Sequence, residues 1–255
     1  MARRDGLRGS VALVTGASSG IGEATARMLA EQGAAVALAA RRADRLEALG
    51  GEIAGKGGTA LPIEADVSDH AEAEAAVERA VEELGRLDIL VNNAGVMLLG
   101  PILEAPVEEW ERMVGVNLLG LMYMTKAAMP HLLEAAEGGR GIADVVNVSS
   151  VAGRIARRGS GVYNATKHGV GAFSESLRQE VTGRHVRVSL VEPGAVATEL
   201  QGHNRPGVRE EIEKRFEDME ILQAEDIAEA IGFVVTRPRR VAVNEFLVRP
   251  TEQEQ

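Results

Sequence analysis

Near its start the chain passes from an apolar run through a glycine-rich loop into a helical repeat. The run 11–15 indicates a buried strand, and apolar side chains recur at helical spacing from residue 21 onward. Between them, Gly16, Gly20 and Gly22 permit close backbone approach, and a helix beginning there offers free N–H groups to a pyrophosphate. A tight turn alone would also use glycine, but this order favours nucleotide binding. The spacing Gly-x-x-x-Gly-x-Gly differs from the general dinucleotide fingerprint, Gly-x-Gly-x-x-Gly.

Further apolar runs of strand length alternate with helical patterns along the rest of the chain. The expected strands cover 35–40, 59–65, 87–91, 142–148, 186–191 and 244–248, and the expected helices cover 43–53, 68–84, 107–136, 162–181 and 224–236. Such alternation predicts a mostly parallel, doubly wound sheet. The composition, 45% apolar but only 3% aromatic, suits strands that are buried on both faces. We therefore predict one α/β domain of the Rossmann type over residues 1–255, with helices on both faces of the sheet.

The end of the second expected strand bears on the choice of cofactor. In dinucleotide-binding folds an acidic residue there accepts a hydrogen bond from the ribose 2′-OH, whereas arginine accommodates a 2′-phosphate. This chain has Ala40 followed by Arg41 and Arg42, and therefore offers two cations and no carboxylate. The pattern favours NADP(H) over NAD(H). The alternative is that the arginines only begin a solvated helix, and we expect one of them to do so.

Tyr163 and Lys167 are four residues apart in an expected helix, so both side chains lie on the same face. A free tyrosine has a pKa of about 10, and a nearby cation lowers that pKa by favouring the phenolate. The pair is thus suited to general acid–base catalysis. The alternative is an ordinary amphipathic helix with a buried tyrosine and a solvated lysine.

Asn117 lies on the apolar face of the long expected helix 107–136. A buried amide without partners costs about 1–3 kcal/mol for each unmet group. Asn117 is therefore either a structural residue that bonds the backbone or part of a proton relay.

Charge and composition argue against several classes of partner. The net charge of −10 disfavours nucleic acids and anionic membranes. The chain has no cysteine, which fits a cytoplasmic location, no signal-peptide pattern and no run near the ~18 apolar residues of a membrane span. Its histidines lack the spacing of metal ligands, so no metal site is expected.

With these residues assigned, the chain resembles the short-chain dehydrogenase/reductase family from Val11 to about Thr198. The resemblance implies a catalytic tetrad of Asn117, Ser150, Tyr163 and Lys167, where Ser150 is chosen over Ser149 because it stands thirteen residues before Tyr163. It also implies that the cofactor is bound by Gly16, Ser18, Ser19, Gly20, Ile21, Arg41, Arg42, Asp66, Val67, Asn93, Ala94, Gly95, Tyr163, Lys167, Pro193, Gly194, Val196 and Thr198.

The resemblance further implies a mechanism and an assembly. Ser150 polarises a substrate carbonyl, Tyr163 supplies the proton, Lys167 lowers the Tyr163 pKa and binds the nicotinamide ribose, and Asn117 holds a water linked to Lys167. A wider likeness to NADP-dependent reductases, including clavaldehyde reductases and reductases of small polar aldehydes or 3-hydroxy acids, leaves the substrate open. Family members are commonly dimers or tetramers, and we predict a homotetramer, with a dimer as the alternative. The expected helices 107–136 and 162–181 carry apolar residues on more than one face, including Leu119, Met122, Met124, Val170 and Phe173. One face should therefore pack on the sheet and another on a partner subunit.

Two questions remain open at the level of sequence. One is function: the prediction is a carbonyl reductase or alcohol dehydrogenase, and the alternatives are a non-catalytic NADP(H)-binding sensor or scaffold, or an epimerase or dehydratase. The other is the substrate. A charged segment at about 195–222 is expected to form a mobile substrate lid with a short amphipathic helix. Arg154, Arg157 and Arg158 either face an anionic substrate group or are solvated surface residues.

Overall fold

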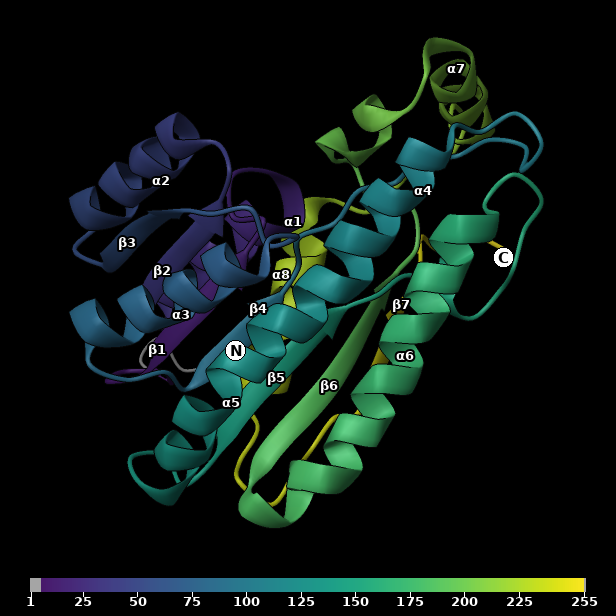
Figure 1. Cartoon of the computed structure of the whole chain (residues 1–255). Coiled ribbons are helices and arrows are strands. Elements are labelled where there is room, and N and C mark those ends of the chain that lie inside the picture. Colours follow the sequence, from purple (N-terminus) through teal and green to yellow (C-terminus); the bar gives the residue numbers. More distant parts are fainter. Residues whose placement is uncertain (1–5, 255) are drawn as a thin grey trace.

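The computed structural model describes residues 6–254, apart from the side chains of residues 213 and 215. Its centre is a sheet of seven parallel strands in the order β3-β2-β1-β4-β5-β6-β7 (Figure 1). The strands are β1 Val11–Thr15, β2 Ala35–Ala40, β3 Thr59–Glu64, β4 Ile89–Asn92, β5 Ala143–Val148, β6 Val186–Pro193 and β7 Glu245–Val248. The strand order reverses between β1 and β4, and open sheets of this kind bind ligands beyond the carboxyl ends of the strands at such a point.

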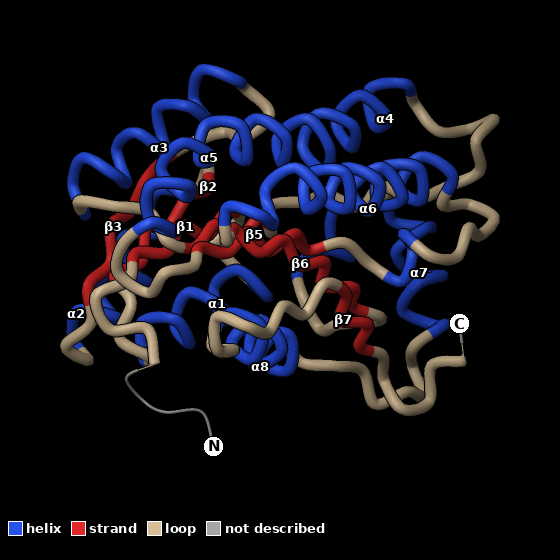
Figure 2. The backbone as a smooth tube through the Cα atoms, turned by 90° about the horizontal axis from the view of Figure 1, so that it is seen from below, coloured by secondary structure: helices blue, strands red, loops and turns tan. Residues whose placement is uncertain are grey.

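Helices cover both faces of the sheet, as Figure 2 shows edge-on. On one face lie α1 Gly20–Glu31, α2 Ala43–Gly55 and α8 Ala224–Val235, and on the other lie α3 His70–Leu84, α5 Leu121–Glu137 and α6 Gly161–Val181. Neighbouring residues of one strand enter opposite cores: Val14 packs with the first group and Leu13 with the second. This explains why the strands read as continuous apolar runs. The predicted doubly wound α/β fold is confirmed.

The long helix predicted over 107–136 is not regular. It consists of α4 Val107–Val114, a π-helical segment η1 Gly115–Gly120 and then α5. A Cβ on Gly120 would come within 2.9 Å of both a methyl group and the carbonyl oxygen of Val67, so only glycine lets this segment approach the neighbouring loop. The prediction of one α-helix was wrong here, because apolar spacing does not reveal a single widened turn. Such segments occur frequently at functional sites.

The segment 195–222 contains a 3₁₀ turn, η4 Glu199–His203, and the helix α7 Pro206–Arg215 (Figure 1). Backbone hydrogen bonds close its base, from Ala197 N to Leu222 O at 2.8 Å and from Leu222 N to Ala195 O at 3.0 Å. The segment therefore leaves the sheet after β6 and returns to the point at which it left. Within residues 6–254, no helix has the length and apolar character needed to cross a membrane.

Candidate active site

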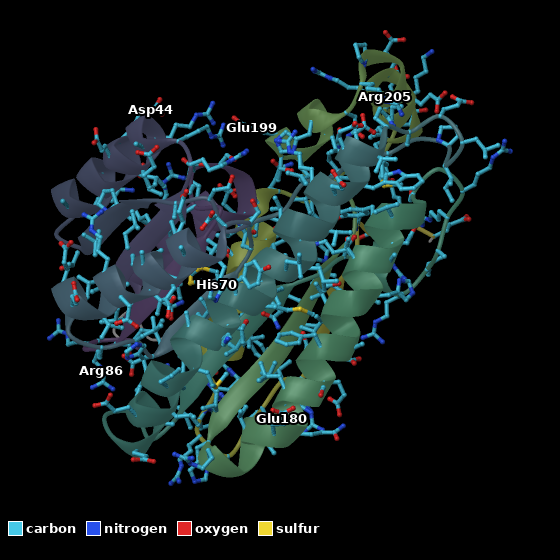
Figure 3. The ribbon with its side chains drawn as sticks, viewed as in Figure 1. Asp44, His70, Arg86, Glu180, Glu199 and Arg205 are labelled. Atoms are coloured by element: carbon cyan, nitrogen blue, oxygen red, sulfur yellow. The ribbon has the colours of Figure 1, made fainter. Side chains whose placement is uncertain are left out.

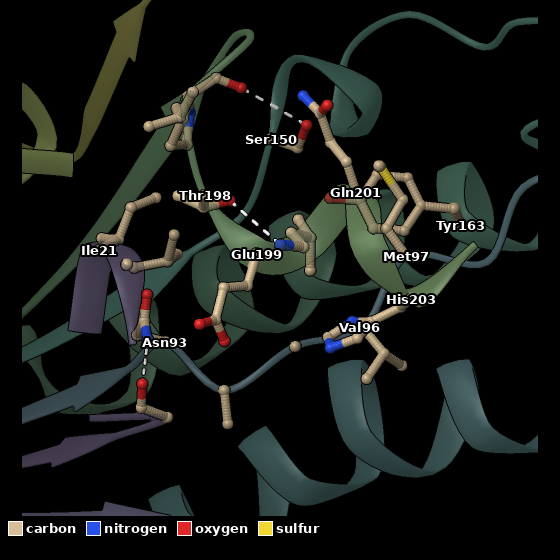
Figure 4. A pocket seen from close by; sticks show the side chains of 18 of the residues that line it. Ile21, Asn93, Val96, Met97, Ser150, Tyr163, Thr198, Glu199, Gln201 and His203 are labelled. Carbon is tan, nitrogen blue, oxygen red and sulfur yellow. Dashed lines mark hydrogen bonds between the residues drawn. The ribbon is translucent and has the colours of Figure 1, made fainter. Parts of the chain in front are cut away.

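A cavity of about 550 Å³ lies beyond the carboxyl ends of the strands and beneath the segment 195–222. All the predicted cofactor-binding residues border it, as do Ser150, Tyr163 and Lys167; Asn117 does not. Figure 4 shows Ile21 and Asn93 towards one end of the cavity and Ser150, Tyr163 and Met97 towards the other, with Thr198 and Glu199 between them. The structure thus brings together residues that are up to about 180 positions apart in the chain.

The glycine loop lies at the N-terminus of α1, and its glycines are required by its conformation and packing. Gly16 and Gly20 have positive φ angles of 66° and 54°. A Cβ on Gly22 would lie 2.4 Å from the carbonyl oxygen of Gly16. The Ser19 side chain makes no capping hydrogen bond to α1, so N–H groups of the first turn remain available to an anion.

The motif after β4 supports this loop from the other side. The Thr15 hydroxyl accepts hydrogen bonds from the backbone N–H groups of Asn93 and Ala94, each at 3.0 Å, and the Asn93 amide donates to Thr15 O at 2.9 Å. These bonds fix the ends of β1 and β4 against each other at the reversal of the strand order. The motif is therefore structural as well as part of the cavity wall.

The two arginines after β2 have different surroundings. Arg42 directly precedes α2, and its guanidinium donates to the hydroxyls of Ser18 (3.0 Å) and Ser19 (2.7 Å) and to the Glu199 carboxylate (2.8 Å). Arg41 is more exposed, and its guanidinium lies 3.7 Å from the Asp66 carboxylate. Arg42 thus begins a helix, as one of the two was expected to do, yet both arginines border the cavity.

Tyr163 and Lys167 project from the first turns of α6 and are both buried. The Lys167 ammonium donates to Val148 O at 2.9 Å and lies 5.8 Å from the centre of the Tyr163 ring. Burial raises the pKa of Tyr163 to about 12, although a hydrogen bond with the Ser150 hydroxyl acts in the opposite direction. Burial also lowers the pKa of Lys167 to about 8.

The direction of the Tyr163 pKa differs from the prediction made from the sequence. The spacing of the pair predicted an ammonium close enough to lower this pKa, but desolvation dominates at both groups. The helix brings the two side chains to one face, as expected. The Lys167 ammonium donates its hydrogen bond to Val148 O at the end of β5, and burial, not this ammonium, dominates the pKa of Tyr163.

Asn117 is buried in the π-helical segment and clamps the backbone of Val96. Its side-chain oxygen accepts from Val96 N at 2.8 Å, and its amide donates to Val96 O at 2.9 Å. The amide also reaches the Thr166 hydroxyl at 3.3 Å, which ties the segment to α6. These contacts correspond to the structural role that the sequence left open.

The three arginines of the loop before α6 separate into different environments. Arg154 pairs with the buried Glu192 at 2.7 Å and also bonds Glu245, so it links the end of β6 to the first residue of β7. Arg157 borders the cavity, whereas Arg158 is exposed and does not.

Several residues of the cavity wall were missed from the sequence. They are Met97, Leu99, Gln201, His203, Phe216 and Gln253. Gln253, from the tail, accepts a hydrogen bond from Ala195 N at 2.9 Å. No motif marks these residues. Met97 and Leu99 reach the cavity from the loop after β4, and the other four reach it through the path of the segment 195–222 or of the C-terminal tail.

Known proteins resemble both the sequence and the fold. A family model described as short chain dehydrogenase matches residues 10–209. An uncharacterized oxidoreductase of Staphylococcus saprophyticus is 36% identical over 251 residues, which are 97% of this chain and 98% of that protein. The closed form of serine dehydrogenase complexed with NADP⁺ superposes with a TM-score of 0.88 at 36% identity, over 96% of each chain. A 3-ketoacyl-(acyl-carrier-protein) reductase from Brucella melitensis complexed with NADH superposes with a TM-score of 0.82 at 35% identity, over 95% of this chain and 98% of that chain.

Proposed function

The chain belongs to the short-chain dehydrogenase family, and from this premise we propose that it is an NADP(H)-dependent carbonyl reductase or alcohol dehydrogenase. The observation that carries the proposal is that Ser150, Tyr163 and Lys167 border the same cavity as the glycine loop at the N-terminus of α1. A hydrogen-bonding hydroxyl, a proton donor and a buried lysine thus adjoin an anion-binding loop in one cavity.

The residues of the cavity fit a dinucleotide. The glycine loop leaves room where a Cβ would collide, and the α1 N-terminus suits a pyrophosphate. Asp66 and Val67 would lie at the adenine, and Asn93 to Gly95 would support the nicotinamide half. The segment from Pro193 to Thr198 would contact the carboxamide. When bound, NADP(H) supplies or accepts the hydride.

The preference for the phosphorylated cofactor is supported by charge. Ala40 offers no carboxylate to a ribose diol, and Arg41, Arg42 and Arg45 gather at the same strand end. Of the two similar structures described above, one is complexed with NADP⁺ and the other with NADH. The proposed preference for NADP(H) therefore rests on the arginines of this chain.

The side chains divide the remaining chemistry among themselves. During reduction the Ser150 hydroxyl donates a hydrogen bond to the carbonyl oxygen, and Tyr163 transfers its proton to that oxygen as the carbon gains the hydride. In alcohol oxidation the proton returns to Tyr163. The raised pKa of Tyr163 keeps its proton in place at neutral pH, which is the state that reduction requires. Lys167 holds positive charge beside the ribose, and Asn117 keeps Val96 and Gly95 against the cofactor cleft.

The segment 195–222 is proposed to act as a lid that opens for substrate and closes over the cavity, and its return to the point of departure allows it to move as a unit. The chain is also proposed to assemble as a homotetramer, with a dimer as the alternative. Two sets of exposed apolar side chains support assembly: Val107, Val114 and Leu119 on α4 and η1, and Phe233, Val241 and Leu247 on α8, the loop after it and β7.

The proposal is tested by following absorbance at 340 nm while purified protein and NADPH meet a panel of aldehydes and ketones. We expect NADPH to be oxidised with at least one class of carbonyl compound. If NADPH binds, as shown by its fluorescence, but no member of a broad panel is reduced, then the chain is a non-catalytic NADP(H)-binding protein instead.

A further inference from the structure

Glu199 joins the segment 195–222 to the arginines that flank the start of α2. Its carboxylate accepts from the guanidinium of Arg42 at 2.8 Å and from that of Arg45 at 2.6 Å. These partners are 157 and 154 residues away in the chain. Figure 3 shows Glu199 on the side of its segment that faces α2, the helix bearing Asp44.

The Arg42 guanidinium has no free nitrogen while this contact is made. Its Nε donates to the Ser18 hydroxyl at 3.1 Å, and its Nη2 donates to the hydroxyls of Ser18 and Ser19. Glu199 accepts a hydrogen bond from the third nitrogen, Nη1. A phosphate that approaches Arg42 from the side of Nη1 that Glu199 occupies must therefore displace this carboxylate.

We propose that Glu199 is a specificity-determining residue that competes with the cofactor's 2′-phosphate for Arg42 and Arg45. The inference rests on the proposed use of NADP(H). Glu199 acts as an internal stand-in for the phosphate: it neutralises the arginines in the free protein and is displaced when NADP(H) binds. It thereby lowers the affinity for NADP(H) while leaving that for NAD(H) unchanged.

Charge and exposure make the displacement feasible. A phosphate monoester carries about −1.5 to −2 charges at pH 7 on three acceptor oxygens, whereas the carboxylate carries one charge on two. The side chains of Glu199, Arg42 and Arg45 are 50%, 40% and 44% exposed. Ion pairs this exposed are weak. Hydrogen bonds from Arg45 and Arg42 lower the pKa of Glu199 to about 2, so the Glu199 carboxylate is negatively charged throughout the neutral pH range.

The same contact fastens the lid at its cofactor end. The Thr198 hydroxyl caps η4 by accepting a hydrogen bond from Leu200 N. The Thr198 methyl group packs on Gly20, where a Cβ would lie 3.0 Å from that methyl carbon. At the substrate end, Asn204 accepts from Leu99 N at 2.7 Å. Release of Glu199 therefore loosens the cofactor end and leaves the substrate end attached.

The test compares dissociation constants for NADPH and NADH, measured by cofactor fluorescence, in the parent chain and in Glu199→Gln. Glutamine keeps the shape of the side chain and removes its charge. We expect NADPH to bind about two- to fivefold more tightly, the range of an exposed ion pair, and NADH to bind as before. Glu211→Gln, an exposed change of the same charge on α7, is the matched control and should alter neither constant.

A second background identifies the partners. In a chain carrying Arg42→Ala and Arg45→Ala, adding Glu199→Gln should no longer affect NADPH binding. If Glu199→Gln tightens NADPH equally in both backgrounds, or leaves it unchanged or weaker in the parent chain, the competition is refuted. Failure of the cofactor proposal would give a different result, because the parent chain itself would then bind NADPH no more tightly than NADH.

Discussion

At the scale of single residues, burial governs the acid–base chemistry. Tyr163 and Lys167 are both buried, and desolvation moves both pKa values towards the uncharged forms. The position of both side chains on one helix face could be predicted from the sequence, since this prediction needs only helical periodicity. The directions of the two pKa shifts could not be predicted, because they depend on everything that surrounds these side chains between α6 and β5. For the same reason the contact of Glu199 with Arg42 has no signature in the sequence.

The pKa of Lys167, about 8, predicts the pH dependence of the reaction. Reduction needs the Tyr163 proton and the Lys167 charge together, so kcat/KM for a carbonyl substrate should be constant at low pH and fall as pH rises through about 8. Alcohol oxidation should rise over the same range, because its base is the pair after loss of one proton.

Lys167→Met removes this ionisation. In that variant the fall in reduction should move upward, towards the Tyr163 pKa of about 12, while activity drops at every pH. An unaltered pH profile in the variant would show that Lys167 is not the titrating group.

Arg41 offers a direct test of cofactor choice. Among the residues that the structure describes, its guanidinium pairs only with a distant carboxylate, 3.7 Å away, so Arg41→Ala should disturb little of the free protein. A charge-assisted hydrogen bond is worth about 1.5–3 kcal/mol, which predicts a rise of about tenfold or more in the KM for NADPH. The KM for NADH should change little, and an equal loss with both cofactors would mean that Arg41 does not contact the 2′-phosphate.

At the scale of elements, the strands and most helices could be predicted, whereas the π-helical segment could not. Apolar runs bounded by turns mark the inner strands β1, β2, β4, β5 and β6 because both faces of these strands are buried. The wider π-helical turn of η1 has no signature in the sequence, because the pattern of apolar residues continues through it from α4 into α5. At the end of this segment Gly120 packs closely against Val67, a contact between residues far apart in the chain.

Two glycine substitutions test this packing. Gly120→Ala introduces a Cβ within 2.9 Å of a backbone oxygen and should lower the free energy of unfolding by about 1–3 kcal/mol. Gly51→Ala, in α2, meets no atom within 4 Å and should raise it by up to ~1 kcal/mol. Both are measured by urea denaturation, and a Gly120→Ala chain as stable as Gly51→Ala would refute the tight contact.

At the scale of the whole molecule, the exposed apolar surface predicts assembly. The sequence predicted that one apolar face of the expected helices 107–136 and 162–181 packs on the sheet and another on a partner subunit. Of the five apolar residues named for these faces, Met124 and Val170 are fully buried and Leu119 alone is prominently exposed. A helix face cannot be assigned to the core or to a partner until its neighbours are known. The exposed apolar side chains near the edge strand β7 had no counterpart in the sequence prediction, and edge strands readily pair with another chain.

Light scattering at micromolar concentration should give four times the 27.0 kDa mass of one chain, or twice that mass if only one of the two apolar surfaces contacts another chain. Leu119→Asp should lower the measured mass by placing a charge among the exposed apolar side chains of α4 and η1. Leu103→Asp is an exposed control outside α4 and η1. A monomer in the parent chain would contradict the proposal.

The central claim is that Tyr163 transfers the proton to and from the substrate oxygen. Tyr163→Phe keeps the buried ring and removes only the hydroxyl, so the fold and NADPH binding should persist. General acid–base catalysis contributes about 10²–10⁴-fold, and kcat on a verified carbonyl substrate should fall by at least that lower factor. A Tyr163→Phe enzyme that retains most of its kcat would contradict the account.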